Sequence, residues 1–438
     1  MTSSFAPFSD LSQELIDQII DALFDNHDID KCEFDLATSE LSPREMSDFC
    51  ACALVCRSFR HRSQKHVFSS MTVLGTRSTK FDQWWRVDKL SEIMQENPRV
   101  ASYVRRLCFN LTNITQQIVE DPFFLHLMEG ITRDWAVGMR LELAIRVSIR
   151  STGLQFQDNE FLETNFIQTS ATPFITSLKL YYVHNVPVTL FAHFPYLMEL
   201  ELDEVNLKAV RPDQAINIDP SLRPRLQKFK FKNSYGDTKP ELATTFIDFS
   251  HLIRISLDAD LSDELPGIIC ILDASSRSLE YMHVSFAKPF SGSGRLSDVY
   301  DLSKFPNLSF LSFEVKLKMA DDKDPLPNLC QMLCTIPGHK NKIKTVVLYV
   351  TIDLPPLLSY SACLDRLADW RPFAIALAKI AERERLVLKF KFDISGAMKA
   401  EGMLDKLDEE MRRWTADNRE LMTKLSSNIS PEYEYKVI

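Results

Sequence analysis

From Tyr103 onward, apolar residues recur in the order apolar-x-x-apolar-x-apolar. Eight matches occur: Val104-Leu107-Phe109, Ile175-Leu178-Leu180, Leu197-Leu200-Leu202, Leu226-Phe229-Phe231, Leu252-Ile255-Leu257, Leu279-Met282-Val284, Leu308-Leu311-Phe313 and Ile343-Val346-Leu348. From the second match, successive starts are 22, 29, 26, 27, 29 and 35 residues apart. Alternation at the last three positions predicts a strand with one buried face. The near-even spacing predicts one such strand per structural repeat.

Further elements are expected between and beyond these matches. Residues 141–149 are apolar at every second position, which predicts a strand where the repeat spacing is obscured. The same alternation over residues 386–392 predicts the last strand. Helical spacing predicts a helix over Phe81–Glu96, ended by Pro98. A second long, charged helix over residues 397–425 is expected to close the end of the repeats.

The first 70 residues follow a helical pattern instead. Apolar residues four apart form one stripe: Leu11, Leu15, Ile19 and Leu23. Ile16 and Ile20 widen this stripe, and Ser12 is placed to cap the helix with its hydroxyl. A second, short helix is densely apolar over residues 49–59. A module this small cannot bury all of these side chains itself, so they either pack on the neighbouring domain or bind a partner.

Three stretches of this region together resemble the F-box proteins of mushroom-forming fungi: Leu11-Ser12-Gln13-Glu14-Leu15, Leu54-Val55-Cys56-Arg57-Ser58-Phe59 and Arg62-Ser63-Gln64-Lys65-His66-Val67-Phe68-Ser69-Ser70. Ser12 stands where the family usually has proline, and residues 24–48 form an unusually long acidic connection. The resemblance implies that the module binds a Skp-type linker protein. It assigns linker binding or module packing to seven residues: Leu11, Leu15, Ile19, Leu23, Leu54, Val55 and Phe59. Which of the seven are core and which contact the linker stays open.

The repeated pattern resembles irregular leucine-rich repeats over roughly residues 100–395, which implies a curved solenoid. The family's usual asparagine after the strand is shifted by one position in Asn206 and Asn233 and lacking in the other repeats, so variable turns are expected. An ordinary α/β domain is the alternative. The expected fold is α/β with five parts: a helical module with an acidic insertion (1–75), a linking or capping helix (76–100), a leucine-rich-repeat-like solenoid (101–395), a C-terminal capping helix (396–425) and a disordered tail (426–438).

Composition narrows the function classes. The net charge of -9 argues against binding driven by attraction to nucleic acid or anionic membranes. No apolar run is long enough to span a bilayer, and the N-terminus lacks the order of a signal peptide. A cytoplasmic or nuclear location, or both, is therefore expected. In a reducing compartment the nine cysteines are expected to be thiols rather than disulfides.

Motifs for catalysis are lacking in the sequence. It has no Walker-type loop, G-x-G-x-x-G, H-E-x-x-H or G-x-S-x-G pattern. The Cys50-x-Cys52-x-x-x-Cys56 spacing lacks a second ligand pair for zinc, and Cys330, Cys334 and His339 lack an evident fourth ligand. The sequence therefore predicts no enzyme, no cofactor and no metal site.

Residues between the apolar positions are expected to form an exposed sheet face. Glu199, Glu201 and Asp203 lie on one predicted strand and Lys228, Lys230 and Lys232 on the next, which predicts cross-strand ion pairs rather than a nucleic-acid site. Aromatic side chains are favoured binding anchors, which makes five outward positions candidates for substrate contact: Tyr181, Tyr281, His283, Phe310 and Tyr349. Packing under loops or the C-terminal helix is the alternative for these five.

The two resemblances together imply an adaptor. F-box modules dock on the linker of a cullin-RING (SCF-type) ubiquitin ligase, and the repeats hold a protein substrate near the ubiquitin-charged enzyme. The expected partners are the Skp-type linker, a cullin through it, and a protein substrate, with no nucleic acid and no membrane. The alternative is a non-catalytic repeat scaffold whose N-terminal helices only cap the solenoid.

Overall fold

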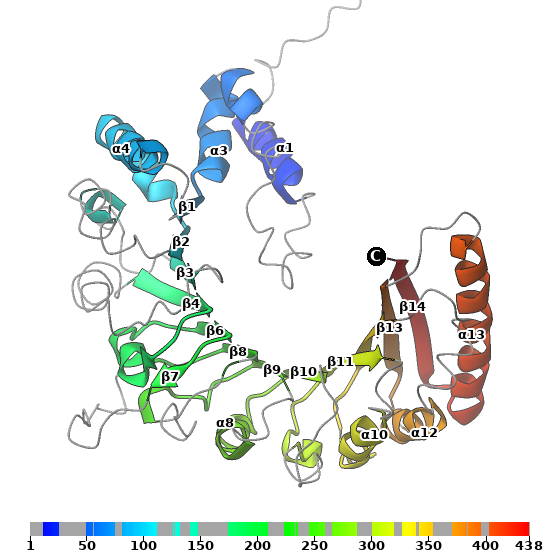
Figure 1. The fold of residues 1–438 in the computed structure, drawn as a ribbon. Helices are drawn as coiled ribbons and strands as arrows, with labels where there is room; N and C mark the ends of the chain where they lie inside the picture. The colour runs from blue at the N-terminus through cyan, green and yellow to red at the C-terminus, as the bar shows by residue number, and fades with distance from the viewer. Residues whose placement is uncertain are drawn as a thin grey trace, which may run out of the picture. The chain divides into compact units, whose positions relative to one another are not determined.

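The computed structural model has an α/β fold (Figure 1). It describes residues 12–25, 50–55, 57–74, 81–111, 126, 128–131, 141–147, 174–208, 223–232, 234, 245–258, 265–286, 300–318, 326–338, 341–353, 370–382, 384–395 and 403–437. The chain divides into two compact units, unit 1 (Met1–Val183) and unit 2 (His184–Ile438). Among the described residues, no helix has both the length and the apolar content that crossing a bilayer requires.

Unit 1 starts with an N-terminal helical module, defined as α1 (Gln13–Asp25), the helical residues 50–55 and α3 (Arg57–Val67). The later elements are β1 (Ser70–Leu74), α4 (Phe81–Glu96), η3 (Pro98–Tyr103), β2 (Arg106–Leu111), β3 (Leu141–Val147) and β4 (Ile175–Tyr181). The four strands pair in parallel in chain order. The predicted helix α4 and strand β3 are confirmed, and Pro98 starts the 3-10 helix that follows α4.

Strand β1 lies within the residues 1–75 that were expected to form the helical module, and it belongs to the sheet of unit 1. Ser70 is the register partner of Arg106. Just before the strand, the Ser69 carbonyl accepts hydrogen bonds from the backbone N–H groups of Arg105 and Arg106 at 2.8 and 2.9 Å. The helical module therefore leads into the sheet without an intervening linker. The predicted acidic insertion over 24–48 lies almost wholly outside the described residues.

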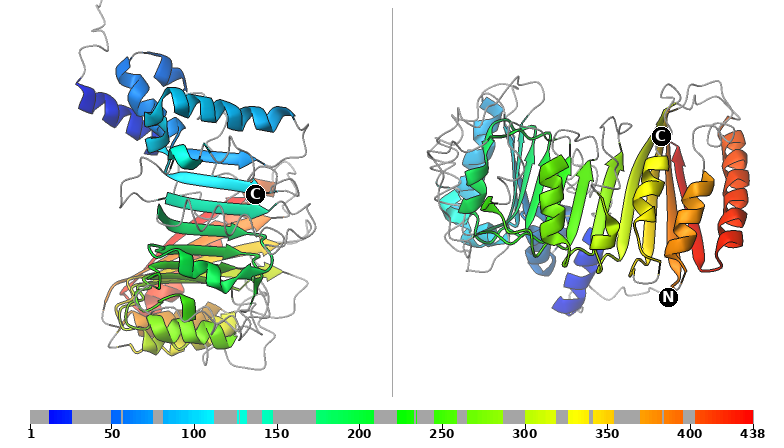
Figure 2. Two further views of the ribbon diagram at one scale, coloured as in Figure 1. Left: turned by 90° about the vertical axis from the view of Figure 1, so that its left-hand side faces the viewer. Right: turned by 90° about the horizontal axis from the view of Figure 1, so that it is seen from below.

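Unit 2 carries one strand for each remaining match. Its elements are β5 (Val186–Pro187), η7 (Val188–His193), β6 (Glu199–Asp203), β7 (Leu207–Lys208), β8 (Lys228–Lys232), β9 (Arg254–Asp258), α8 (Leu265–Ser275), β10 (Tyr281–Phe286), η10 (Leu302–Lys304), β11 (Phe310–Lys318), α10 (Leu326–Cys334), β12 (Thr345–Asp353), α12 (Trp370–Ile380), β13 (Leu386–Ser395), α13 (Met403–Leu425) and β14 (Ile429–Val437). The strands run parallel in the order β6-β8-β9-β10-β11-β12-β13-β14, as Figure 2 shows from below. β5 and β7 form a separate small ladder.

The strand register places the predicted apolar positions opposite one another. The third apolar residues of the six matches in unit 2, with Phe390 of β13, form one cross-strand row: Leu202, Phe231, Leu257, Val284, Phe313, Leu348 and Phe390. All seven are buried. Because parallel partners in register share a face of the sheet, the sequence pattern produces one continuous apolar layer.

Helices cover this apolar layer. In Figure 1, α8, α10, α12 and α13 all lie on the same face of the sheet of unit 2. Phe390 shows the packing: its ring lies 6.3 Å from Phe373 and 6.0 Å from Trp370, both on α12, and 6.1 Å from Trp414 on α13. We call the face opposite these helices the open face.

The C-terminal prediction is wrong in two respects. Residues 429–437, expected to be disordered, form strand β14, which pairs with β13 over nine residues. Helix α13 is therefore the crossover between two parallel strands and not a terminal cap. The physical reason is the packing of Tyr433 between β13 and α13. Its ring stacks on the ring of Phe390 with centroids 5.0 Å apart, and the guanidinium carbon of Arg419 on α13 lies 5.6 Å from the Tyr433 ring centroid.

Candidate protein-binding surfaces

The N-terminal helical module has a small core of its own. Ile16, Ile20 and Phe59 are buried together, and two partly buried residues, Cys52 and Val67, pack against them. Phe59 is therefore a core residue of the module, one of the two roles that the sequence left open for it. The helix rotation explains this: residues 16 and 20 face α3, so the stripe one residue earlier, Leu15 and Ile19, faces away.

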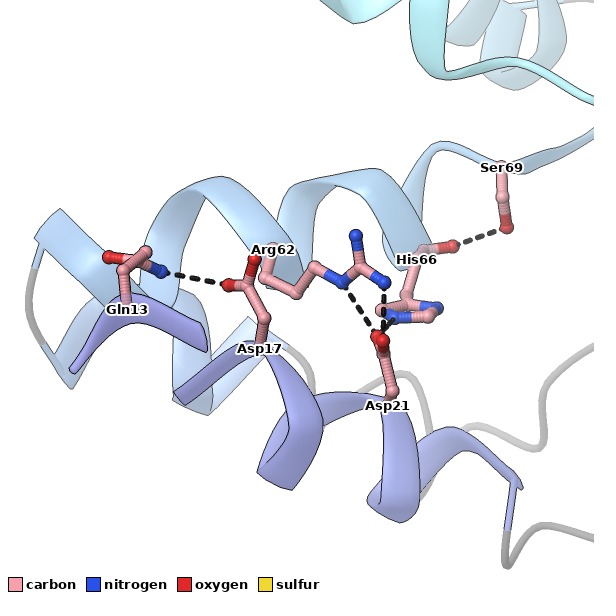
Figure 3. A network of polar contacts seen from close by, with 6 residues as sticks. All are labelled: Gln13, Asp17, Asp21, Arg62, His66 and Ser69. Carbon is pink, nitrogen blue, oxygen red and sulfur yellow. Dashed lines mark hydrogen bonds and ion pairs between the residues drawn. The ribbon is translucent and has the colours of Figure 1, made fainter. Parts of the chain in front are cut away.

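Polar contacts fix the first helix at its start. The Ser12 hydroxyl accepts a hydrogen bond from the backbone N–H of Leu15 at 3.3 Å, and the Ser12 carbonyl accepts one from the N–H of Ile16 at 3.1 Å. The predicted cap is thus confirmed. Within α1, Gln13 donates to Asp17 Oδ1 at 2.8 Å (Figure 3). Gln13 also donates to the Ser58 carbonyl at 3.2 Å, which ties the first turn of α1 to α3.

A charged cluster ties the other end of α1 to α3. Arg62 Nε donates to Asp21 Oδ1 at 2.6 Å, and Arg62 Nη2 donates to Asp21 Oδ2 (Figure 3). His66 Nε2 lies 2.9 Å from the same Oδ1. The hydrogen bonds from Arg62 hold the pKa of the Asp21 carboxyl below its usual value, against the smaller opposing effect of burial. Sequence reasoning missed this cluster, although Arg62 and His66 both lie in the third stretch that carries the F-box resemblance.

Four large apolar side chains of the module are exposed. Leu15 and Ile19 on α1 are 43% and 39% exposed, and Leu54 and Val55 in the short helix are 79% and 59% exposed. Leu11 lies outside the described residues, and the side chain of Leu23 is likewise not described. Exposed apolar surface of this kind, on a small module that has its own core, is typical of a protein-binding surface.

The module also contacts the rest of unit 1. His61 of α3 packs edge-on against Tyr103 of η3, with ring centroids 5.8 Å apart. Helix α4 packs against η3 in turn.

The open face of unit 2 carries the predicted ion pairs. Lys228 Nζ lies 2.7 Å from Glu199 Oε1, and Lys230 Nζ lies 2.5 Å from Glu201 Oε1, between direct register partners. The cross-strand interpretation of these charges is confirmed. At the other end of the sheet, Lys389 pairs with a glutamate of β14 at 3.1 Å. Opposite charges at both flanks of the open face are therefore matched within the protein.

The centre of the open face is aromatic. Tyr281 and Phe310 are register partners on β10 and β11, and their rings stack with centroids 4.5 Å apart and planes 13° apart. Both are half-buried, so their ring surfaces remain accessible. Arg254 of β9 lies in the same register row, with its guanidinium carbon 5.7 Å from the Tyr281 ring centroid. Sequence reasoning missed Arg254, although it precedes Ile255 just as Tyr281 precedes Met282.

His283 is buried beneath this surface rather than exposed on it. Its Nδ1 lies 2.9 Å from Ser312 Oγ, and its Nε2 lies 3.9 Å from Glu314 Oε2. Burial, with the charges of two nearby lysines, lowers the pKa of His283 to about 4, so the ring is neutral near pH 7. Ser312 is only 1% exposed, so this Ser-His-Glu arrangement offers a substrate no access and acts as a polar core contact.

The other two aromatic candidates differ from each other. Tyr349 of β12 is half-buried on the open face, edge-on to His283 at 6.4 Å, with Lys391 Nζ 5.6 Å from its ring centroid. Tyr181 is buried at the end of β4, in unit 1. The structure therefore groups Tyr281, Phe310 and Tyr349 on neighbouring strands as surface residues, and leaves His283 and Tyr181 as interior residues.

The cysteine and histidine residues do not form a metal centre in the described part of the chain. Cys330 is buried and Cys334 is exposed on α10, while His339 lies outside the described residues. No group of three or more histidine, cysteine, aspartate or glutamate side chains is suitably placed to hold a metal among the residues the structure covers.

Comparison with known proteins gives no relative. No protein-family model matches the sequence, and a search of curated proteins finds no match either. The two surfaces described above are therefore the basis for inferring function.

Proposed function

We propose that this protein is a substrate-recognition adaptor of a cullin-RING (SCF-type) ubiquitin ligase. The N-terminal helical module docks on a Skp-type linker protein, and unit 2, as an irregular leucine-rich-repeat solenoid, holds a protein substrate. The protein makes and breaks no bond itself. It raises the local concentration of substrate at the ubiquitin-charged enzyme.

One observation carries the proposal: the module completes its core with Ile16, Ile20 and Phe59, yet leaves Leu54 and Val55 largely exposed. The core of the module does not need these two side chains. When a partner covers them, the free energy of binding becomes more favourable by about 25 cal/mol for each Å² of apolar surface removed from water. Their positions coincide with the Leu-Val pair of the F-box-like stretch, which supports a docking role.

The repeated ladder supports the second half of the proposal. Strands one repeat apart pair in register through equivalent residues, such as Met282 with Leu311 and Val346 with Leu388. Stacked units of this kind present a broad sheet face for binding. The half-buried aromatic residues at the centre of the open face are suited to anchoring a partner.

Linker capture tests the proposal. Full-length protein carrying Leu15→Glu with Val55→Glu is compared with the unaltered chain for binding to an immobilised Skp-type linker protein. Each lost apolar contact removes roughly 1.5–3 kcal/mol, so we expect capture to fall by at least about a hundredfold. The matched control is Ile375→Glu, which charges an isoleucine of α12 that is exposed outside the module.

Thermal unfolding followed by circular dichroism accompanies the capture measurement. The double variant is expected to unfold like the unaltered chain, because both side chains are exposed. A folded double variant that still captures the linker at full strength would show that the docking assignment is wrong.

A repeat scaffold whose N-terminal helices serve only as a cap is the second candidate. The contact between His61 and Tyr103 favours it, because it shows the module covering part of unit 1. On this alternative the unaltered protein captures no linker. Charging Leu15 and Val55 then changes no interaction.

A further inference from the structure

The charges on the open face are matched at its flanks but not at its centre. Lys228, in the same register row as Arg254, is neutralised by Glu199 at 2.7 Å. The guanidinium of Arg254 is exposed and has no carboxylate within ion-pair distance among the described residues. Within the part of the chain that the structure describes, Lys228 thus has a carboxylate partner and Arg254, one strand away, has none.

Arg254 is also held in place by an apolar surface. It lies over the ring of Tyr281, and Tyr281 stacks on Phe310. Stacking restricts the long arginine side chain, so less conformational entropy is lost when a carboxylate binds to its fork. An ordered cation beside two accessible rings is suited to a ligand that combines a carboxylate with an apolar side chain.

We propose that Arg254, Tyr281 and Phe310 bind a short acidic segment of a protein, in which a carboxylate meets Arg254 and a neighbouring apolar side chain covers the two rings. This inference rests on the proposed function, because it names the chemistry of the substrate segment. A single-stranded nucleic acid fits less well. A chain of phosphates needs several cations along its length, whereas Lys228 and Lys230 on this face are already paired with Glu199 and Glu201.

The experiment selects ligands without bias and then tests the charge. A phage-displayed library of random 12-residue peptides is selected on the full-length protein. Selected peptides are labelled with fluorescein and their affinities are measured by fluorescence anisotropy. We expect the selected set to be enriched in aspartate or glutamate next to a large apolar residue. Affinity is expected to fall as salt is added, because the ion pair is exposed.

Two variants test the site, and a third, with the same change of charge one strand away, is the matched control. Arg254→Gln is expected to weaken binding about tenfold, and Phe310→Ala at least as much. Lys228→Gln removes the same charge one strand away and is expected to leave binding within about twofold, because that lysine is already paired.

Several results would overturn the inference. These are an absence of selected peptides, a selected set without excess acidic residues, equal losses in the Arg254→Gln and Lys228→Gln variants, or tighter binding of a labelled 12-nucleotide oligothymidine than of any peptide. The linker-capture experiment distinguishes failure of this inference from failure of the proposed function. Acid-selective peptide binding without linker capture overturns the adaptor role alone, and linker capture without acid selectivity overturns the present inference alone.

Discussion

The N-terminal helical module and the sheet of unit 2 use the same kinds of apolar residue with different results. In unit 2, the strands that carry the matches bury their patterned residues, and side chains such as Phe313 and Phe390 are completely buried. In the module, two packed helical segments bury only one face of each, and Leu15 and Val55 stay exposed. An apolar pattern therefore indicates a core where a second layer of structure packs against it. It indicates a binding surface where the module is too small to supply that second layer.

The sharpest test of this comparison lies in the core of unit 2. Phe390→Ala is expected to lower the free energy of unfolding by about 3–5 kcal/mol, because it leaves a cavity between α12 and α13. Urea denaturation followed by tryptophan fluorescence measures it, since Trp370 and Trp414 both contact the ring. Lys391→Ala on the open face is the control and is expected to cost less than about 1 kcal/mol. A loss below 1 kcal/mol in Phe390→Ala would contradict the packing described here.

A smaller effect is expected in the core of the module. Ile20→Ala removes a fully buried side chain from a cluster of three, and we expect it to cost about 2–3 kcal/mol. Hydrogen exchange is expected to quicken in α1 and to stay unchanged in β12, since the two lie in different compact units. The control is Ile19→Ala, the adjacent exposed isoleucine. Equal exchange rates in the two variants would refute the assignment of Ile20 to the core.

The smallest effect concerns the ion pairs between α1 and α3. The pKa of Asp21 is lower in the folded state than its usual value of 3.8. Its stabilising effect is therefore complete above about pH 4 and is lost as the pH falls through the lowered pKa. Asp21→Asn is expected to cost about 1 kcal/mol at pH 7, because the pair is partly exposed but bidentate.

Hydrogen exchange of α1, measured between pH 7 and pH 3, checks this expectation after correction for the intrinsic pH dependence of exchange. The unaltered chain is expected to lose protection of α1 below about pH 4, while Asp21→Asn shows little change over that range. Asp17→Asn is the control, since the Asp17 carboxylate accepts a hydrogen bond from the Gln13 amide within α1 and lies outside the bidentate pair with Arg62. Identical pH profiles for Asp21→Asn and the unaltered chain would rule out the Asp21 cluster as a pH-dependent contact.

The strands with a repeated match could be predicted from the sequence because each shows a local alternation of apolar and polar residues. Leu311 and Phe313 of the seventh match lie in β11, and the alternation from Leu141 lies in β3, as predicted. β14 escaped prediction because Pro431 and the charges around it are typical of loops. It is a strand because β13 and α13 are already in place to pair with it and cover it.

The sequence by itself determined the position of each strand that carries a repeated match, the strands β3 and β13, the helix over Phe81–Glu96, the cap at Ser12 and the pairing of Lys228 with Glu199. These features depend on neighbours along the chain or on the regular step between repeats. Only the tertiary structure decided that Ile16 and Ile20, rather than Leu15 and Ile19, face the core, and that His283 is buried while Arg254 lies over the ring of Tyr281. The reason is that a periodic pattern specifies which residues share a face, whereas the elements packed on that face determine whether it is covered.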